Sequence, residues 1–362
     1  MFLTMLLKAI MISTLSSEVP LPQGPGLASK YKGDRGIEND PDVIFVEDFE
    51  EGSMLAVKSR WEDVKDGGVM SLSTDVPPAS GGRFSLLMTH TGGKWTGGHL
   101  YRRLLPGYDR LFFRFYVKFD PNCYPIHHFF HVGGYNPPTQ WPQGGAGERP
   151  KGNDRFSIGV EPFGKRWTWD YYVYWMEMRG SPPKGKTWGN TFIRDPNLKA
   201  ERGRWVCVEL MVKMNDPVEE RNGELALWID GRLVSHLGEG FPRGVWVYDK
   251  FVPKEMWAYE SFIDFVPGRG GRGVRWNYEK EEGETFKVPD EGIPFEGFRW
   301  RNTDELKLNF LWILLYITDA PSGYESRVWF DHIVVAKEYI GPIEPSPAVR
   351  SATWGRTKVR SK

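Results

Sequence analysis

The chain has 362 residues, of which 40% are hydrophobic and 15% aromatic, so it is long enough for one large domain with a substantial core. Lysine plus arginine and aspartate plus glutamate both total 47, and this balance argues against a nucleic-acid or anionic-membrane partner. The only cysteines, Cys123 and Cys207, exclude a disulfide framework and a metal–thiolate cluster. Whether these two thiols pair or stay separate is left open by their spacing.

The amino-terminal segment is apolar but interrupted. Residues 1–17 form an apolar run broken by Lys8 and followed by small polar residues, which is typical of a weak secretory signal. The alternative is a disordered or weakly amphipathic leader. The run is too short and too interrupted to cross a bilayer, so we expect a secreted or periplasmic protein without stable membrane insertion. Residues 18–41 are rich in Pro, Gly and charge and are expected to form a linker or wrapped tail, so leader and linker together occupy 1–41.

Strand patterns recur from residue 42 onwards, with apolar residues alternating with polar ones or forming short runs. Asn222-Gly223 is a turn of the kind that joins two antiparallel strands. The glycines and aromatic residues also favour strands and turns over helices. The predicted strands are residues 43–49, 110–119, 156–161, 170–178, 205–214, 225–234, 306–318 and 328–335.

Many strands without long helical periodicity predict an all-β protein. The expected architecture is a two-sheet antiparallel jelly-roll sandwich over 42–342. Two long loops are expected within it, at 136–155 and at 240–300, both rich in Gly and Pro. The basic segment 343–362 contains few apolar residues and is predicted to be disordered.

Four segments resemble the concanavalin A-like jelly rolls of secreted polysaccharide lyases, such as the alginate and glucuronan lyase families. They are residues 45–52, residues 111–119 with 131–135 and 155–159, residues 203–213 with 222–231, and residues 329–335. The resemblance implies a concave sheet that binds an extended polysaccharide and cleaves uronate-containing glycans by β-elimination. Where alginate lyases carry Gln-x-His and Tyr-Phe-Lys-x-Gly-x-Tyr strands, this chain has Ile126-His127-His128 and Tyr172-Val173-Tyr174.

Residues 126–178 concentrate groups that can transfer protons, including three of the seven histidines within five residues. A polyuronate lyase must neutralise the uronate carboxylate, remove the C5 proton and protonate the leaving oxygen. Histidine and tyrosine suit the proton transfers, and arginine suits the carboxylate. The predicted catalytic residues, on one groove, are His127, His131, Tyr172, Tyr174 and Arg114. The predicted substrate-binding residues are Tyr116, Tyr135, Trp141, Gln143, Arg155 and Glu161.

This chemistry requires no cofactor. In a regular strand His127 and His131 would lie about 13 Å apart, and His127 and His128 would point to opposite faces, which argues against a transition metal. A structural Ca²⁺ is favoured instead, because hard oxygen ligands are available. Its expected ligands are Asp48 and Asp331, on the first and last strands; the alternative is that both are solvated acids at strand ends.

Two other functions remain open at this stage. One is a glycoside hydrolase that uses Glu161 with Glu177 or Asp170 as its pair of carboxylates. The other is a carbohydrate-binding sandwich without catalytic activity, because concave binding faces also carry aromatic side chains, histidine and arginine.

Overall fold

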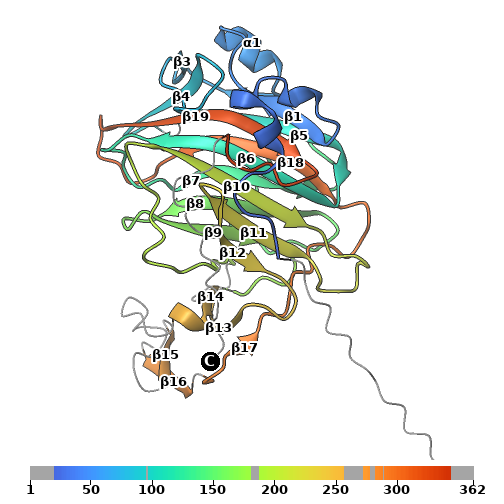
Figure 1. Ribbon diagram of the computed structural model, residues 1–362. Helices are drawn as coiled ribbons and strands as arrows, with labels where there is room; N and C mark the ends of the chain where they lie inside the picture. Colours follow the sequence, from blue (N-terminus) through green and yellow to red (C-terminus); the bar gives the residue numbers. More distant parts are fainter. Residues whose placement is uncertain are drawn as a thin grey trace, which may run out of the picture.

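Two antiparallel sheets pack face to face in the computed structural model (Figure 1), which describes residues 20–94, 97–180, 187–256 and 289–343 and the backbone of β15 (Arg272–Asn277) and β16 (Glu282–Lys287). The first, called the front sheet, has six strands. Their order is β2 (Asp63–Lys65), β5 (His99–Tyr108), β18 (Leu308–Tyr316), β7 (His128–Tyr135), β8 (Arg155–Phe163) and β9 (Thr168–Tyr174).

The second, called the back sheet, has eight strands. Their order is β12 (Arg232–Leu237), β11 (Glu224–Ile229), β10 (Trp205–Lys213), β6 (Arg110–Phe119), β19 (Glu325–Ala336), β4 (Ser85–Thr91) and β3 (Met70–Ser73), with β1 (Val43–Glu47) also paired to β19. These two sheets confirm the predicted all-β antiparallel sandwich. The remaining described helices are short: α1 (Met54–Ser59) and the 3₁₀ turns η1 (Leu27–Lys30), η2 (Lys32–Asp34), η3 (Ile37–Asn39) and η4 (Lys254–Met256).

The core lies between the two sheets and is largely aromatic. The alternation predicted for 110–119 holds, since Leu111, Phe113, Phe115, Val117 and Phe119 are all buried on the inner face of β6. From the front sheet, Phe130 stacks on Phe115 with ring centroids 4.1 Å apart. Because side chains alternate along a strand, this packing directs the other residues of β6 to the outer face of the back sheet.

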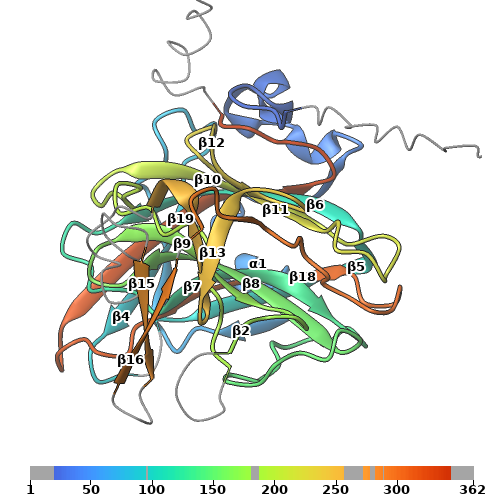
Figure 2. The same ribbon diagram turned by 90° about the horizontal axis from the view of Figure 1, so that it is seen from below.

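The outer face of the back sheet is covered by the chain itself. Leu27, Ala28 and Ile37 pack there against Phe112 and Trp228. Figure 2 shows the amino-terminal turns outside the layer of β6, β10 and β11. The folded unit therefore begins before the expected boundary at residue 42.

Arg114 and Tyr116 are buried on the outer face of the back sheet, so the prediction that they line the groove with the histidines is wrong. The Arg114 side chain is fully buried and pairs with Asp34 Oδ2. His332 Nδ1 lies 3.0 Å from the same oxygen. The hydroxyl of Tyr116 accepts a hydrogen bond from the backbone N–H of Ile343 at 2.9 Å. The physical reason is that residues 20–41, which lack any periodic pattern, cover Arg114, while Ile343 and Ala79 pack on Tyr116.

Part of the region expected to be an extended loop, 240–300, forms strands. β13 (Arg243–Val247) pairs with β14 (Lys250–Pro253) and β17 (Ile293–Pro294), and β15 pairs with β16. Aromatic packing supports this region: Phe298 stacks on Trp300 with centroids 4.1 Å apart, and Trp246 contacts Trp175. In the expected loop at 136–155 there is no strand before β8 begins at Arg155.

Further expectations concern the two ends of the chain. The expected signal segment 1–17 and nearly all of the expected tail, 344–362, lie outside the described residues. Among the residues described, no helix is long and apolar enough to cross a membrane.

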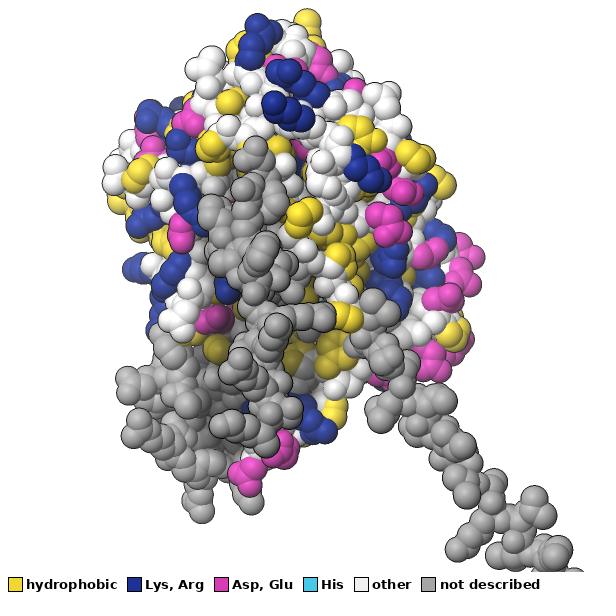
Figure 3. Space-filling view, in the orientation of Figure 1, with side chains coloured by type: hydrophobic (Ala, Val, Ile, Leu, Met, Phe, Trp, Pro, Cys, Tyr) yellow, Lys and Arg dark blue, Asp and Glu magenta, His cyan; other side chains and the backbone are white. Residues whose placement is uncertain are grey.

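On the face seen in Figure 3, side chains of both charges are interspersed, in keeping with the zero net charge. Cys123 and Cys207 are both free and buried.

We expect Asp34→Asn to lower the free energy of unfolding by about 3 kcal/mol or more, because it leaves the buried Arg114 charge without its counter-ion. Asparagine tolerates the left-handed backbone that Asp34 adopts (φ 62°), so the change tests the charge and not the conformation. Glu38→Gln, on the exposed side of the same segment, is the control and should change stability by less than about 0.5 kcal/mol. Denaturant unfolding measures both; equal effects would contradict the role of the pair.

Glu209 predicts a pH dependence of stability. Burial raises the pKa of this carboxyl to about 7, although it accepts hydrogen bonds from the N–H groups of Ile340 and Gly341. A folded pKa above the unfolded one gives stability that is complete at acidic pH and is lost as pH rises through about 7, here about 3 kcal/mol. Between about pH 5 and pH 8 the melting temperature should therefore fall more steeply with rising pH for the wild type than for Glu209→Gln. If the melting temperatures of the two proteins changed in parallel with pH, the Glu209 carboxyl would ionise normally.

Candidate functional site

A cavity of about 660 Å³ opens on the outer face of the front sheet, on the side opposite the core. A volume of this size suits a ligand of several sugar rings. Strands β7, β8, β9 and β18 form its floor, and the loop at residues 143–146 and Trp188 form part of its wall. A second hollow of about 300 Å³ shares His127, His128 and Tyr172 with it, so the depression continues along the sheet.

The cavity brings together many of the predicted site residues. Those among its lining are His127, His131, Tyr172, Tyr174, Tyr135, Gln143 and Arg155. Four others are placed elsewhere. Arg114 and Tyr116 are on the back sheet, Trp141 is 58% exposed and lies outside the cavity lining, and Glu161 lies behind the lining histidines.

An irregularity at the start of β7 sets the position of the histidines. Phe129 and Phe130 are both buried in the core, which breaks the alternation of a regular strand. The pairing with β18 shifts at the same place, between Ile313 and Tyr316. As a result His128 and His131, three positions apart, lie on the same face with ring centroids 5.0 Å apart. The expectation of a regular strand here is therefore wrong. The argument against a transition metal, which assumed the spacing of a regular strand, is wrong with it.

Glu161 on β8 joins the two histidines. Its Oε1 lies 2.9 Å from His128 Nδ1 and 3.1 Å from His131 Nε2, and the residue is only 1% exposed. Burial raises the pKa of Glu161, but the two neighbouring imidazoles lower it by more, so the pKa lies below its ordinary value. Gly159 leaves room for this arrangement, since a Cβ there would stand 2.8 Å from Glu161 Oε1 and 2.9 Å from His131 Cε1. The result is a buried carboxylate held against two imidazoles, in place of the predicted substrate contact.

Tyr172 and Tyr174 on β9 face the histidines. Their hydroxyls lie 3.3 Å apart, and the Tyr172 ring is 5.2 Å from the ring of His128. Burial raises the pKa of Tyr172 above its ordinary value, and the hydrogen bond with Tyr174 adds to this. Burial also lowers the pKa of His127, and the charge of His128 lowers it further. The site thus combines a phenol that keeps its proton with an imidazole that gives up its proton readily.

The loop at 136–155 forms part of the cavity wall and is anchored there by hydrogen bonds. Gly147 N donates to the hydroxyl of Tyr174 at 3.3 Å, and Gln143 N donates to the hydroxyl of Tyr135 at 3.1 Å. Arg155 holds the same loop by donating from Nη2 to the carbonyl of Glu148 at 3.2 Å. These contacts place a guanidinium and two backbone-anchored tyrosines at the cavity, as expected for a loop that contacts ligand.

The cavity lining includes residues that were not predicted from the sequence, among them His128, Trp188, Trp312 and Tyr316. Tyr316 and Trp312 are the cross-strand partners of His128 and His131, so they share the outer face with them. The sequence pattern that could have identified Trp312 and Tyr316 lies in 306–318, where these two aromatic residues, four positions apart, interrupt the apolar run. The signal for His128 was the Phe129-Phe130 pair, since two large apolar side chains in succession indicate a bulge when one face is polar.

The carboxylates proposed for a hydrolase are engaged in other contacts. Asp170 is the cross-strand partner of Glu161, but its oxygens accept backbone N–H bonds from Phe192, Ile193 and Arg194 at 2.9, 3.0 and 3.1 Å. Glu177 forms an ion pair with Arg221 at 2.8 Å. Both residues organise the loops around β9.

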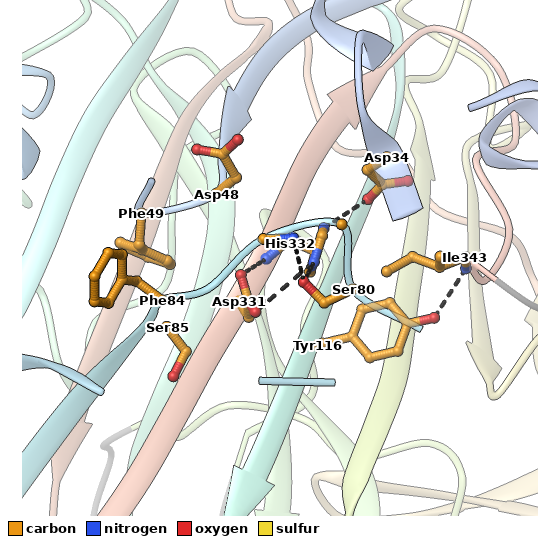
Figure 4. A network of polar contacts seen from close by, with 12 residues as sticks. Asp34, Asp48, Phe49, Ser80, Phe84, Ser85, Tyr116, Asp331, His332 and Ile343 are labelled. Atoms are coloured by element: carbon orange, nitrogen blue, oxygen red, sulfur yellow. Dashed lines mark hydrogen bonds and ion pairs between the residues drawn. The ribbon is translucent and has the colours of Figure 1, made fainter. Parts of the chain in front are cut away.

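Asp48 and Asp331, the expected Ca²⁺ ligands, lie near each other on the back-sheet side (Figure 4). Asp331 Oδ1 accepts the N–H of His332 at 2.7 Å, whereas its buried Oδ2 has no hydrogen-bond partner among the described residues. Burial raises the pKa of Asp331 well above its ordinary value, and the charge of Asp48 adds to this. Asp331 is therefore not a solvated acid. Ca²⁺ binding by these two carboxylates stays a prediction.

No protein-family model and no curated protein matches the sequence. Among solved structures, a mutant of the alginate lyase Aly36B in complex with an alginate tetrasaccharide is similar, with 11% identity and a TM-score of 0.48 over 81% of this chain and 96% of that chain. Alginate lyase vAL-1 from Chlorella virus is 12% identical, with a TM-score of 0.47 over 82% of this chain and 100% of that chain. The endo-β-1,4-glucuronan lyase from the fungus Trichoderma reesei is 15% identical, with a TM-score of 0.42 over 81% and 95%. These likenesses concern the fold.

Gly189 provides a test of the cavity geometry. A Cβ at this position would stand 2.7 Å from ring atoms of Tyr172, so Gly189→Ala should displace that ring. We expect any ligand of this cavity to bind more weakly, with a melting temperature within a few degrees of the wild type. Gly180→Ala, where a Cβ meets nothing within 4 Å, is the matched control and should bind normally. Unchanged affinity in both variants would mean that Tyr172 does not shape the binding site.

Proposed function

We propose that this protein is a polysaccharide lyase that cleaves uronate-containing glycans by β-elimination. The observation that carries the proposal is the approach of the tyrosine pair to the histidines across one cavity, with the rings of Tyr172 and His128 5.2 Å apart. Candidate proton donors and acceptors are therefore neighbours at one cavity, and the volume of this cavity suits sugar rings. The uronate as substrate follows from the resemblance found in the sequence and from the positive groups at the cavity.

The reaction assigns one task to each part of the cavity. The uronate carboxylate lies against Arg155 and the His128–His131 pair, which stabilise the negative charge that develops when C5 loses its proton. His127 accepts the C5 proton, the C5–H electrons form the C4–C5 double bond, and the C4–O bond breaks. Tyr172 donates its proton to the leaving oxygen. The exposed ring of Trp188 and the ring of Trp312 supply stacking surfaces for neighbouring sugars.

A noncatalytic carbohydrate-binding function is the alternative, and one assay separates the two. The full chain is incubated with a panel of uronate-containing and neutral polysaccharides. Unsaturated uronate absorbance and new reducing ends are then followed together. Both signals on a polyuronate support the lyase. New reducing ends without absorbance would show a hydrolase, and binding without either signal would show a binding protein; both would overturn the proposal.

Tyr172→Phe should lower turnover about a hundredfold or more, the usual effect of removing a general acid, while substrate affinity changes little because the ring remains. Tyr324→Phe is the control and should leave turnover unchanged. It removes a hydroxyl that lies away from the cavity and donates to the carbonyl of Asn122. The measurement is kcat and KM on the polysaccharide identified by the panel. Similar small losses in both variants would contradict a proton transfer by Tyr172.

Trp188→Ala should act mainly on KM, because the side chain is 41% exposed at the cavity and offers a stacking surface without a transferable proton. Trp141→Ala is the matched control, since Trp141 is also exposed but lies outside the cavity lining. We expect KM to rise several-fold in the first variant only. A fall in kcat with unchanged KM for Trp188→Ala would show that the ring acts on the chemical step.

A further inference from the structure

Three potential metal ligands converge at the floor of the cavity. His128 Nδ1, His131 Nε2 and a carboxylate oxygen of Glu161 all lie within 4.8 Å of one another. The carboxylate oxygen is 2.9 Å from the first nitrogen and 3.1 Å from the second. Ligand atoms in a tetrahedral Zn²⁺ site are about 3.3 Å apart, so the carboxylate oxygen needs to move away from each nitrogen by only a few tenths of an ångström to share an ion with it.

Two buried atoms of this cluster lack hydrogen-bond partners among the described residues. Glu161 Oε2 has none, and His131 Nε2 is close to Glu161 Oε1 without the geometry of a hydrogen bond. A buried polar atom without a partner costs free energy, so such atoms indicate a missing ligand. A cation bound by His128, His131 and Glu161 gives His131 Nε2 a partner, and it satisfies Oε2 as well if the carboxylate binds through both oxygens.

We propose that His128, His131 and Glu161 form a site for one divalent transition-metal ion, with Zn²⁺ as the best match. Two imidazoles and one carboxylate suit Zn²⁺, whereas Ca²⁺ prefers six to eight oxygen ligands. Three protein ligands leave one position of a tetrahedral ion free. Because His128 and His131 line the cavity, the free position faces the space in which a substrate lies.

The role of the ion rests on the proposed function, although its binding does not. A divalent cation at this point binds the uronate carboxylate through the free position and neutralises its charge. Its positive charge also balances the buried Glu161 carboxylate. In the absence of an ion, the same three groups would have to share a proton, and the net charge offered to the substrate would be smaller.

The test is metal binding by the full chain, independent of activity. The protein is stripped with a chelator and titrated with Zn²⁺ by calorimetry, and with Co²⁺ followed by visible absorbance, which reports coordination number and ligand type. We expect one equivalent to bind, and His131→Ala and Glu161→Gln to weaken binding at least tenfold to a hundredfold. His128→Ala should do the same. Melting curves identify any variant that has failed to fold, and the other two then decide the result.

His236→Ala is the matched control. His236 Nε2 lies 2.8 Å from Glu224 on the back sheet, so this variant also breaks a histidine–glutamate pair, but one with a single histidine. Its Zn²⁺ binding should equal that of the wild type. No bound equivalent, or an equivalent that all three cavity variants retain, overturns the site. Full lyase activity after stripping would overturn the role of the ion in the reaction and leave the proposed function standing. Stoichiometric binding without any lyase activity would leave the metal site standing and overturn the proposed function.

Discussion

The packing of aromatic side chains between the two sheets is the constraint on which the rest of this molecule depends. Phe115 on the back sheet contacts both Phe129 and Phe130 on the front sheet, with centroid distances of 5.9 and 4.1 Å. Burying both rings outweighs the cost of one irregular pairing, because each large aromatic side chain contributes a few kcal/mol by leaving water. The core therefore forces the bulge, and the bulge turns His128 and His131 toward the same side. The chemistry of the outer face follows from the packing of the inner one.

The two outer faces of the sandwich are used differently. On the front sheet the polar residues surround a cavity, whereas on the back sheet they are buried beneath the amino-terminal segment. The buried charge of Arg114 is balanced by Asp34 from that segment, with His332 as a third member. Asp34 and His332 both have positive φ values, 62° and 48°, which indicates that the surrounding contacts hold them in place. The cover is thus part of the fold, since removing it would leave an uncompensated charge.

Much of this could be predicted from the sequence, and the failures have physical causes. Alternation along 110–119 identified the inner face of β6, because burial on one side imposes a period of two. It could not identify what covers the other side, since residues 20–41 pack through irregular 3₁₀ turns without a period. Tyr172 and Tyr174 line the same cavity as His131, because β9 is regular and directs both side chains to one face. His128 was missed because a single bulge reverses the direction of a side chain, and bulges depend on packing with distant residues such as Phe115.

The cover of the back sheet also determines where the described chain enters and leaves. Leu27 N and Ala28 N bond the carbonyls of Tyr339 and Ile340 at 3.1 and 2.8 Å, so the first and last described segments run side by side. Both lie on the side of the sandwich away from the cavity. A linker joined at either segment, for a fusion partner or for attachment to a solid support, would begin on the face of the sandwich opposite the cavity. The protein could then be immobilised with its cavity turned toward a polymer in solution.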